Sequence, residues 1–159
     1  MLSRLLAWLV DPAQWSGSTG IPARLLEHLG YTALTVLIAA VIAVPIGAVV
    51  GHSRRGGIAV VGVANGLRAL PELGVLTLFA VLLGVGLLPP VLALVLIAVP
   101  PLLAGTYSGV AGAPASAVDA ARGVGMRESQ ILLGVELPTA LPLVLGGLRL
   151  AAQIGRAHV

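Results

Sequence analysis

Long apolar runs separated by short polar breaks dominate the chain. The first clear run covers about residues 31–50, and a second covers 58–88 with a few polar interruptions. A third covers 91–107, and a shorter fourth covers 141–153. A helix needs about 20 apolar residues to cross a bilayer. The pattern therefore predicts an all-α membrane protein, a polytopic bundle of transmembrane helices whose fourth span is incomplete.

The composition agrees with a membrane protein and excludes several other classes. The chain is 58% hydrophobic and only 9% charged, whereas about a quarter of the residues of a soluble domain are charged. Without cysteine it has neither a disulfide framework nor a thiolate metal site. No nucleotide-binding loop, catalytic triad or pair of carboxylates is evident. A scattered net charge of +3 does not suggest nucleic acid. We therefore expect no enzyme activity, cofactor, metal or nucleic-acid partner.

Residues 1–30 precede the first run and are predicted to form an interfacial, extracytoplasmic segment. Leu5, Leu6, Trp8 and Leu9 suit a short helix at the membrane surface, where Trp is favoured. A Ser/Gly-rich linker at 17–20 follows.

The Arg residues predict the topology. Arg54 and Arg55 follow the first run, and Arg122 and Arg127 lie between the third and fourth. Cytoplasmic loops accumulate Arg, so both pairs should lie on the cytoplasmic side, with an even number of crossings between them. One helix over 58–88, kinked at Pro71, and the 91–107 span supply two crossings. The N-terminus is then outside a bacterial inner membrane.

Arg68 and Glu72 interrupt the second run. They lie four residues apart, so on a continuous helix they would share a face. Two interpretations stay open, because intramembrane charges line substrate paths but also form structural ion pairs, here in the cytoplasmic third of the kinked helix. Pro100 and Pro101 in the third run are predicted to kink that helix and, secondarily, to act as a hinge.

Residues 110–138 form a polar loop, and its segment 119–138 holds five of the fifteen charged residues. Ser116 and Asp119 have the spacing of a capping box, which predicts a short helix from about residue 117 to 122. Gly123 and Gly125 should end that helix. A second short helix is predicted over 127–135. Two short cytoplasmic helices would thus project from the membrane.

Small residues in this loop predict a docking surface. Ala120, Ala121 and Gly125 would allow another protein to approach closely, and the loop contains no evident catalytic group. Pro138 is expected to close the loop as the next span begins.

The loop resembles the EAA loop of ABC-importer permeases, whose pattern is E-A-A, three residues, G, nine residues, I, one residue and L-P. Here Asp119-Ala120-Ala121 is followed at that spacing by Gly125, Val135 and Leu137-Pro138. Asp119 replaces Glu, and Val135 replaces Ile.

The wider chain is similar to one branch of that superfamily, the permeases for the osmoprotectants glycine betaine, carnitine and choline. The similar segments are 67–74, 83–90, 100–109 and 135–149. The resemblance implies a type I importer fold, a second permease subunit, an extracytoplasmic solute-binding protein and an ATPase subunit that hydrolyses ATP and holds the loop in a groove. This family often has Thr or Ser where this chain has Glu72, so its pathway residues do not carry over directly.

Alternatives remain open at this point: a permease for an amino acid such as methionine or another small solute, a membrane-embedded enzyme, or a structural membrane bundle without transport activity. The chain has only five aromatic residues, too few within the spans for a cage around a quaternary ammonium group. The final segment, 154–159, is unlike the family. We expect it to be a non-native tail on a truncated reading frame, with no function for Arg156 or His158.

Overall fold

The computed structural model describes residues 4, 8 and 10–154. Within them the secondary structure is helical, and the chain divides into two compact units, Met1–Leu34 and Thr35–Val159. Several residues named above lie outside the described residues: Leu5, Leu6 and Leu9 of the predicted interface helix, and Arg156 and His158 of the tail.

The first unit contains the 3₁₀-helix η1, Pro12–Gln14, and the start of α2, Ile21–Ser53. Asp11 caps η1, because its Oδ1 accepts a hydrogen bond of 3.0 Å from the amide of Ala13. Helix α2 begins before residue 31, since the polar lead-in of the first run is already helical. The side chains of Arg24 and Glu27 pair there at 3.0 Å, which is the i,i+3 spacing of neighbours on a helix surface.

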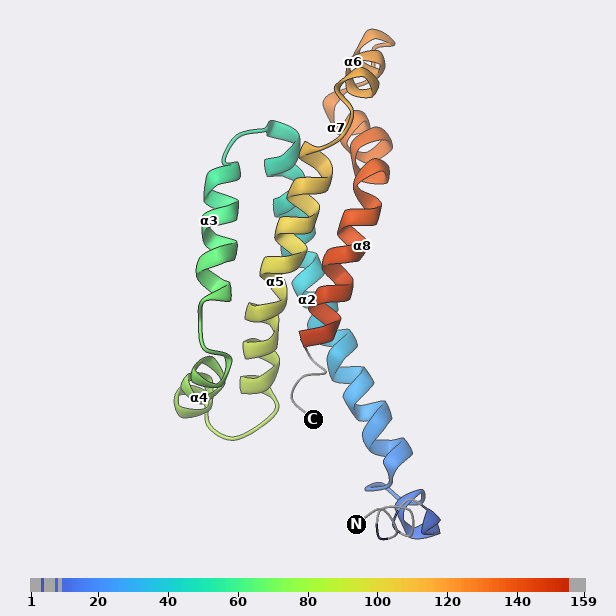
Figure 1. Cartoon of the computed structure of the whole chain (residues 1–159), viewed down its shortest axis with the longest axis vertical. Helices are drawn as coiled ribbons and strands as arrows, with labels where there is room; N and C mark the ends of the chain where they lie inside the picture. The colour runs from blue at the N-terminus through green and yellow to red at the C-terminus, as the bar shows by residue number, and fades with distance from the viewer. Residues whose placement is uncertain (1–3, 5–7, 9, 155–159) are drawn as a thin grey trace. The chain divides into compact units, whose positions relative to one another are not determined.

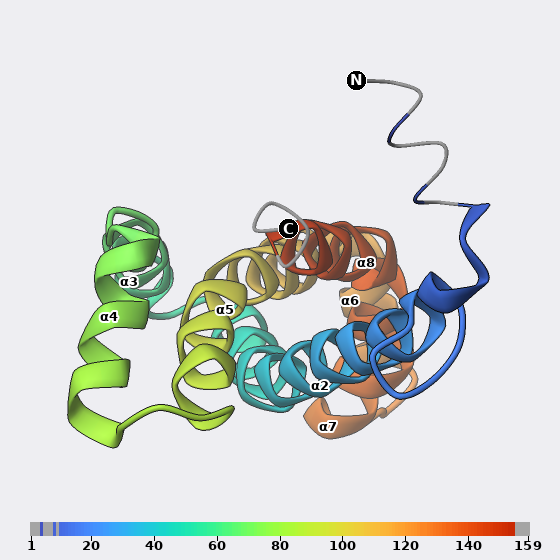
Figure 2. The same ribbon diagram turned by 90° about the horizontal axis from the view of Figure 1, so that it is seen from below.

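In the second unit, α5, Leu88–Ala111, packs between the second half of α2 and α8, Leu137–Ile154 (Figure 2). Glycines bring these helices into backbone contact. A Cβ on Gly47 would lie 2.8 Å from Thr106 Cβ, and one on Gly109 would lie 2.7 Å from Ala140 Cβ. Small residues allow such close approach between membrane helices.

Helices α3, Gly57–Arg68, and α4, Glu72–Leu83, lie on the other side of α5 and correct one prediction. The sequence predicts a single helix over 58–88 with a kink at Pro71. The structure instead has two helices bent by 81°. Pro71 lacks an N–H and disfavours a helical conformation at the residue before it. It takes an extended conformation, with φ −69° and ψ 119°, and caps α4.

Pro100 and Pro101 lie inside α5, and both are buried. The helix continues through them and extends at both ends beyond the predicted 91–107. Two carbonyls one turn earlier lose their helical partners, because proline has no N–H to donate.

The polar loop forms α6, Ala115–Gly123, and α7, Glu128–Ile131. Two details differ from the prediction. Pro114 is the N-cap of α6 and Ser116 lies within the helix, so the predicted capping box is absent. The second short helix is not separate either, because α7 continues through a π-helical turn η2, Leu132–Glu136, into α8.

Three helical segments of the described chain are long and apolar enough to cross a membrane: Ile21–Ser53, Leu88–Ala111 and Glu128–Gln153. The bent pair α3–α4 adds a fourth if it is one broken span. The last segment has 26 residues, since the helix starts well before residue 141. The chain is therefore a multi-pass membrane protein. In Figure 1, α6 and α7 lie beyond one end of α5, and α4 lies toward the other.

Candidate functional site

The polar loop folds into a compact knuckle, defined here as residues 113–136, with a small core of its own. Ala113, Val118, Ala121 and Ile131 are buried there, and Met126 and Val135 pack against them. Ala121 is only 6% exposed, so its small side chain serves this core and is not offered to a partner, contrary to expectation. Ala120 and Asp119 are exposed beside it on α6.

Gly125 ends α6 in a left-handed conformation, with φ +84°. Its amide donates to the carbonyl of Arg122 at 3.0 Å, and the next amide, Met126, donates to Ala121 at 3.1 Å. This pair of bonds is the Schellman motif, in which glycine avoids the penalty of positive φ. No atom outside the immediate backbone lies within 4 Å of a Cβ built on Gly125. Conformation, rather than space inside the chain, therefore requires glycine here.

The Leu137-Pro138 pair shapes the junction between the knuckle and α8. Because Pro138 has no N–H and would collide with the carbonyl four residues earlier, the helix widens to a π-turn. Leu137 N–H donates to the carbonyl of Leu132, five residues back. The hydroxyl of Thr139 donates to the carbonyl of Val135 at 2.6 Å. Pro138 thus lies inside a helix and does not close a loop.

A chain of charged groups joins the knuckle to the end of α2. Glu136 is 2% exposed, and its Oε2 lies 2.6 Å from Nδ1 of His52. The other ring nitrogen of His52, Nε2, lies 3.2 Å from Oε2 of Glu128. Arg122 then donates to both carboxylate oxygens of Glu128, at 2.9 and 3.0 Å.

Further groups extend this network across α6. Asp119 Oδ1 lies 3.7 Å from Arg122 Nη1. The hydrogen bonds that Arg122 donates to Glu128, and then the charge of Glu128, raise the pKa of Arg122 above its ordinary value, so the guanidinium stays charged. A polar cavity of about 350 Å³ adjoins the network. Its lining residues are His52, Ser53, Arg54, Ala115, Val118, Asp119, Arg122 and Glu136.

Sequence reasoning missed His52 and Glu136. The two residues lie 84 positions apart, and nothing in the local pattern of either predicts the contact. The available signal was composition, because an isolated His at the end of a long apolar helix and a Glu between Val and Leu both need polar partners.

A second group of residues surrounds the break between α3 and α4. Arg68 ends α3 and Glu72 begins α4, so they do not share the face of one helix as predicted. Both nevertheless line a cavity of about 540 Å³. Its other lining residues are Leu67, Leu70, Ile97, Pro101, Leu150 and Gln153.

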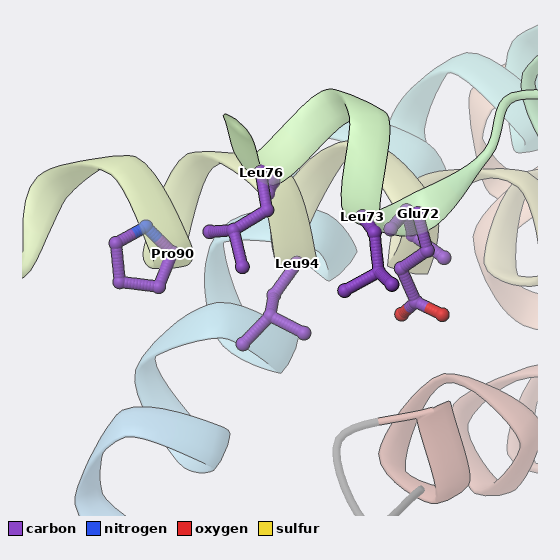
Figure 3. Close-up of a pocket in the computed structure, with 7 residues that line it drawn as sticks. Glu72, Leu73, Leu76, Pro90 and Leu94 are labelled. Carbon is purple, nitrogen blue, oxygen red and sulfur yellow. The ribbon is translucent and has the colours of Figure 1, made fainter. Parts of the chain in front are cut away.

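Glu72 also lines a more apolar cavity of about 390 Å³ between α4 and α5 (Figure 3). Leu73 and Leu76 contribute from α4, and Pro90, Ala93, Leu94 and Ile97 contribute from α5. The half-buried carboxylate of Glu72 is the one charged group of this lining. A single anionic group among aliphatic side chains suits a small organic cation.

Fold and site together define a multi-pass membrane protein with a structured polar knuckle at one end of its bundle. Residues 43–155 match the family model for the binding-protein-dependent transport system inner membrane component. The chain belongs to this family, in agreement with the resemblance of its polar loop.

Bacterial permeases are among its relatives. A choline transport system permease protein of Bacillus subtilis is 34% identical over 123 residues, covering 77% of this chain and 57% of the relative. A carnitine transport permease protein of Listeria monocytogenes is 33% identical over 126 residues, covering 79% and 58%. An osmoprotectant import permease protein of Salmonella typhimurium is 36% identical over 130 residues, covering 80% and 55%. The chain spans a little over half the length of these curated relatives.

Proposed function

We propose that this chain is the membrane-spanning permease subunit of an ATP-driven importer for small osmoprotectants such as glycine betaine, carnitine or choline. The observation that carries the proposal is the knuckle. There the motif residues, which run from Asp119 to Pro138 at the start of α8, fold into a projection with its own hydrophobic core and a network of ion pairs. The substrate class comes from the names of the relatives, which transport choline, carnitine or osmoprotectants.

In this proposal the chemistry belongs to partners. An ATPase subunit receives the exposed face of α6 in a groove, a second permease subunit completes the pathway, and an extracytoplasmic solute-binding protein delivers the substrate. Closure of the ATPases on ATP moves the knuckle and turns the pathway from inward- to outward-facing. Such coupling needs contacts that differ between the two states, and the exposed residues Asp119 and Ala120 offer them on α6.

The proposed orientation puts the knuckle in the cytoplasm and the N-terminus outside. The loop that carries Arg54 and Arg55 lies at the same end of the second unit as the knuckle, to which His52 joins it. Two Arg-rich segments at one end of the bundle favour that end as cytoplasmic.

Arg68 and Glu72 are the proposed polar lining of the pathway. Helix α3 has 12 residues and rises about 1.5 Å per residue, so its far end lies about 18 Å from its start. The hydrocarbon core is about 30 Å thick. In the proposed orientation the two charges therefore lie near the middle of the membrane, deeper than the cytoplasmic third expected from sequence. Mid-membrane charges beside a cavity favour a role in the pathway over a structural pair.

Docking is tested by adding bulk to the exposed face of α6. We expect Ala120→Trp to abolish co-purification of the ATPase subunit and uptake of radiolabelled glycine betaine by the reconstituted complex. Gly125→Trp should do the same, but it also strains the turn, where an L-residue costs about 1–2 kcal/mol. Gly125→Asn is the matched control, since Asn tolerates positive φ, and it should retain docking and uptake.

Two results would contradict the proposal. Normal ATPase binding and transport in Ala120→Trp would remove the docking role of α6. Uptake of an amino acid such as methionine by the wild-type complex, with no uptake of glycine betaine, choline or carnitine, would reassign the substrate.

A further inference from the structure

The contact between Glu136 and His52 is unusual in its burial. Glu136 is 2% exposed, and the side chain of His52 is 20% exposed. A carboxylate removed from water is costly unless it is paired and hydrogen-bonded. The 2.6 Å contact with His52 Nδ1 supplies that partner. The knuckle thus places its one buried charge against α2.

His52 bridges two carboxylates from different parts of the knuckle. Nδ1 faces Glu136 at the end of the π-turn, and Nε2 faces Glu128 at the start of α7. An ionised carboxylate only accepts hydrogen bonds, so each is a suitable partner for an N–H of the His52 ring. Glu128 passes the link to α6 through its two bonds to Arg122. One side chain of α2 is therefore tied to every helical segment of the knuckle.

The polar contacts of this link are concentrated in one residue, although Ala48 of α2 also shares an apolar cluster with Leu132 of the knuckle. Among the described residues, every hydrogen bond and ion pair that joins α2 to the knuckle passes through His52. The covalent route from α5 into α6 runs through Gly112, Ala113 and Pro114, a short non-helical connection. On its other side the knuckle continues as one helix through η2 into α8, so a displacement reaches α8 directly. Helix α2 has no such covalent route, and its polar attachment to the knuckle is His52.

Helix α2 can pass such a displacement on. Immediately before His52, a Cβ on Gly51 would lie 2.8 Å from Val110 Cβ, and about one turn earlier a Cβ on Gly47 would lie 2.8 Å from Thr106 Cβ. Close packing without voids transmits strain rather than absorbing it. Movement at His52 is thus carried along α2 to α5.

We propose that His52 is the positioning residue that couples the knuckle to the membrane helices. It holds Glu136 and Glu128 so that knuckle motion moves α2, and with it α5. This inference rests on the proposed function, because the motion comes from the ATPase subunit. Without His52 the knuckle still docks and the ATPase still turns over, but α2 no longer follows the knuckle.

The test uses the full complex in proteoliposomes, with glycine betaine uptake and ATP hydrolysis measured on the same samples. In His52→Ala and in Glu136→Gln, we expect uptake to fall about tenfold, within the usual 5- to 150-fold range of coupling between sites. ATP hydrolysis should stay within about twofold of wild type, so that more ATP is consumed per solute. The double variant should be no worse than the poorer single variant, as expected for partners in one interaction.

Two further variants make the test specific. His52→Arg presents a cation with several donors and should recover most of the uptake. His28→Ala makes the same change near the start of the same helix α2 and should leave the ATP-to-solute ratio unchanged.

Several results would overturn the inference. An unchanged ATP-to-solute ratio in His52→Ala would show that the link does not couple. Loss of ATPase co-purification in that variant would assign His52 a purely structural role. A wild-type complex that neither binds an ATPase nor transports any osmoprotectant would overturn the proposed function itself, which is a different failure.

Discussion

Two regions of the second unit use glycine and proline in opposite ways. In the core formed by α2, α5 and α8, glycines hold backbones in contact, and prolines lie within a continuous buried helix. In the arm formed by α3 and α4, glycines such as Gly62 and Gly66 face open space, and the helix is interrupted at Pro71. The same residue types thus make a tight unit in one place and an open one in the other.

This difference in packing suits the core and the arm to different tasks. Lipid tails are as apolar as leucine, so close packing and polar contacts, rather than hydrophobic burial, hold membrane helices together. The core has this close packing and carries the knuckle. The arm packs mainly on α5 and borders the cavities at Glu72. Its leucines and valines are largely exposed; Leu73 is 73% and Val81 77% exposed.

The largest expected effect is on core packing. A Cβ on Gly147 of α8 would lie 2.8 Å from the carbonyl oxygen of Pro101, a backbone atom that cannot turn aside. We expect Gly147→Leu to lower the free energy of unfolding by about 3 kcal/mol, the upper range for overpacking. Unfolding of the purified protein in mixed micelles, followed by circular dichroism, measures it.

The neighbouring glycine is the control. Gly146 is exposed, and a Cβ built there meets no atom within 4 Å beyond its own helix. Gly146→Leu should leave stability within about 0.5 kcal/mol of wild type, as for surface substitutions. If both variants were equally destabilised, the contrast between tight and open packing would not hold.

Much of this contrast was accessible from sequence. The apolar runs predicted the helices, and Asp119-Ala120-Ala121 with Leu137-Pro138 predicted the loop and the family. Pro71 marked the site of the break. Its 81° angle was not predictable, because it depends on how α3 and α4 each pack on α5.

Other features of the knuckle became clear only from the fold. Helix spacing could have shown that Val118 and Ala121, three apart, face inward together, so the burial of Ala121 had a signal. The capping-box pattern at Ser116 was a false one, since Pro114 already starts the helix. The contact between His52 and Glu136 had no local signal, because it depends on α2 and α8 meeting the same end of α5.

The next effect concerns function in the arm. Glu72→Gln removes the charge but keeps the shape of the side chain. The quaternary ammonium group of choline has no N–H, so its attraction to Glu72 is Coulombic, about 4 kcal/mol for charges about 4 Å apart near a protein surface. Choline uptake by the reconstituted complex should therefore fall about tenfold or more. Stability should stay within about 0.5 kcal/mol, since the arm contributes little packing to the core.

Thr77→Ala is the matched variant on the same helix. Its hydroxyl donates to the carbonyl of Leu73 at 2.7 Å, and it is not among the residues lining either cavity. Uptake should be unchanged. Normal choline uptake in Glu72→Gln would remove the cavity from the pathway, and a large loss of stability would make the arm structural.

The smallest expected effect is a gain in stability, opposite in sign to the loss expected for Gly147→Leu. Gly62 lies within α3, is exposed, and a Cβ there meets no atom within 4 Å. Alanine is favoured over glycine in a helix interior by about 0.5–1 kcal/mol, so Gly62→Ala should raise stability by up to that amount.

The same substitution can be compared in the two regions by measuring the unfolding of Gly62→Ala and Gly147→Ala in mixed micelles. The core variant should be destabilised, because its methyl group would press on the Pro101 carbonyl. Destabilisation of both variants would mean that the arm is packed against a surface in the assembled protein.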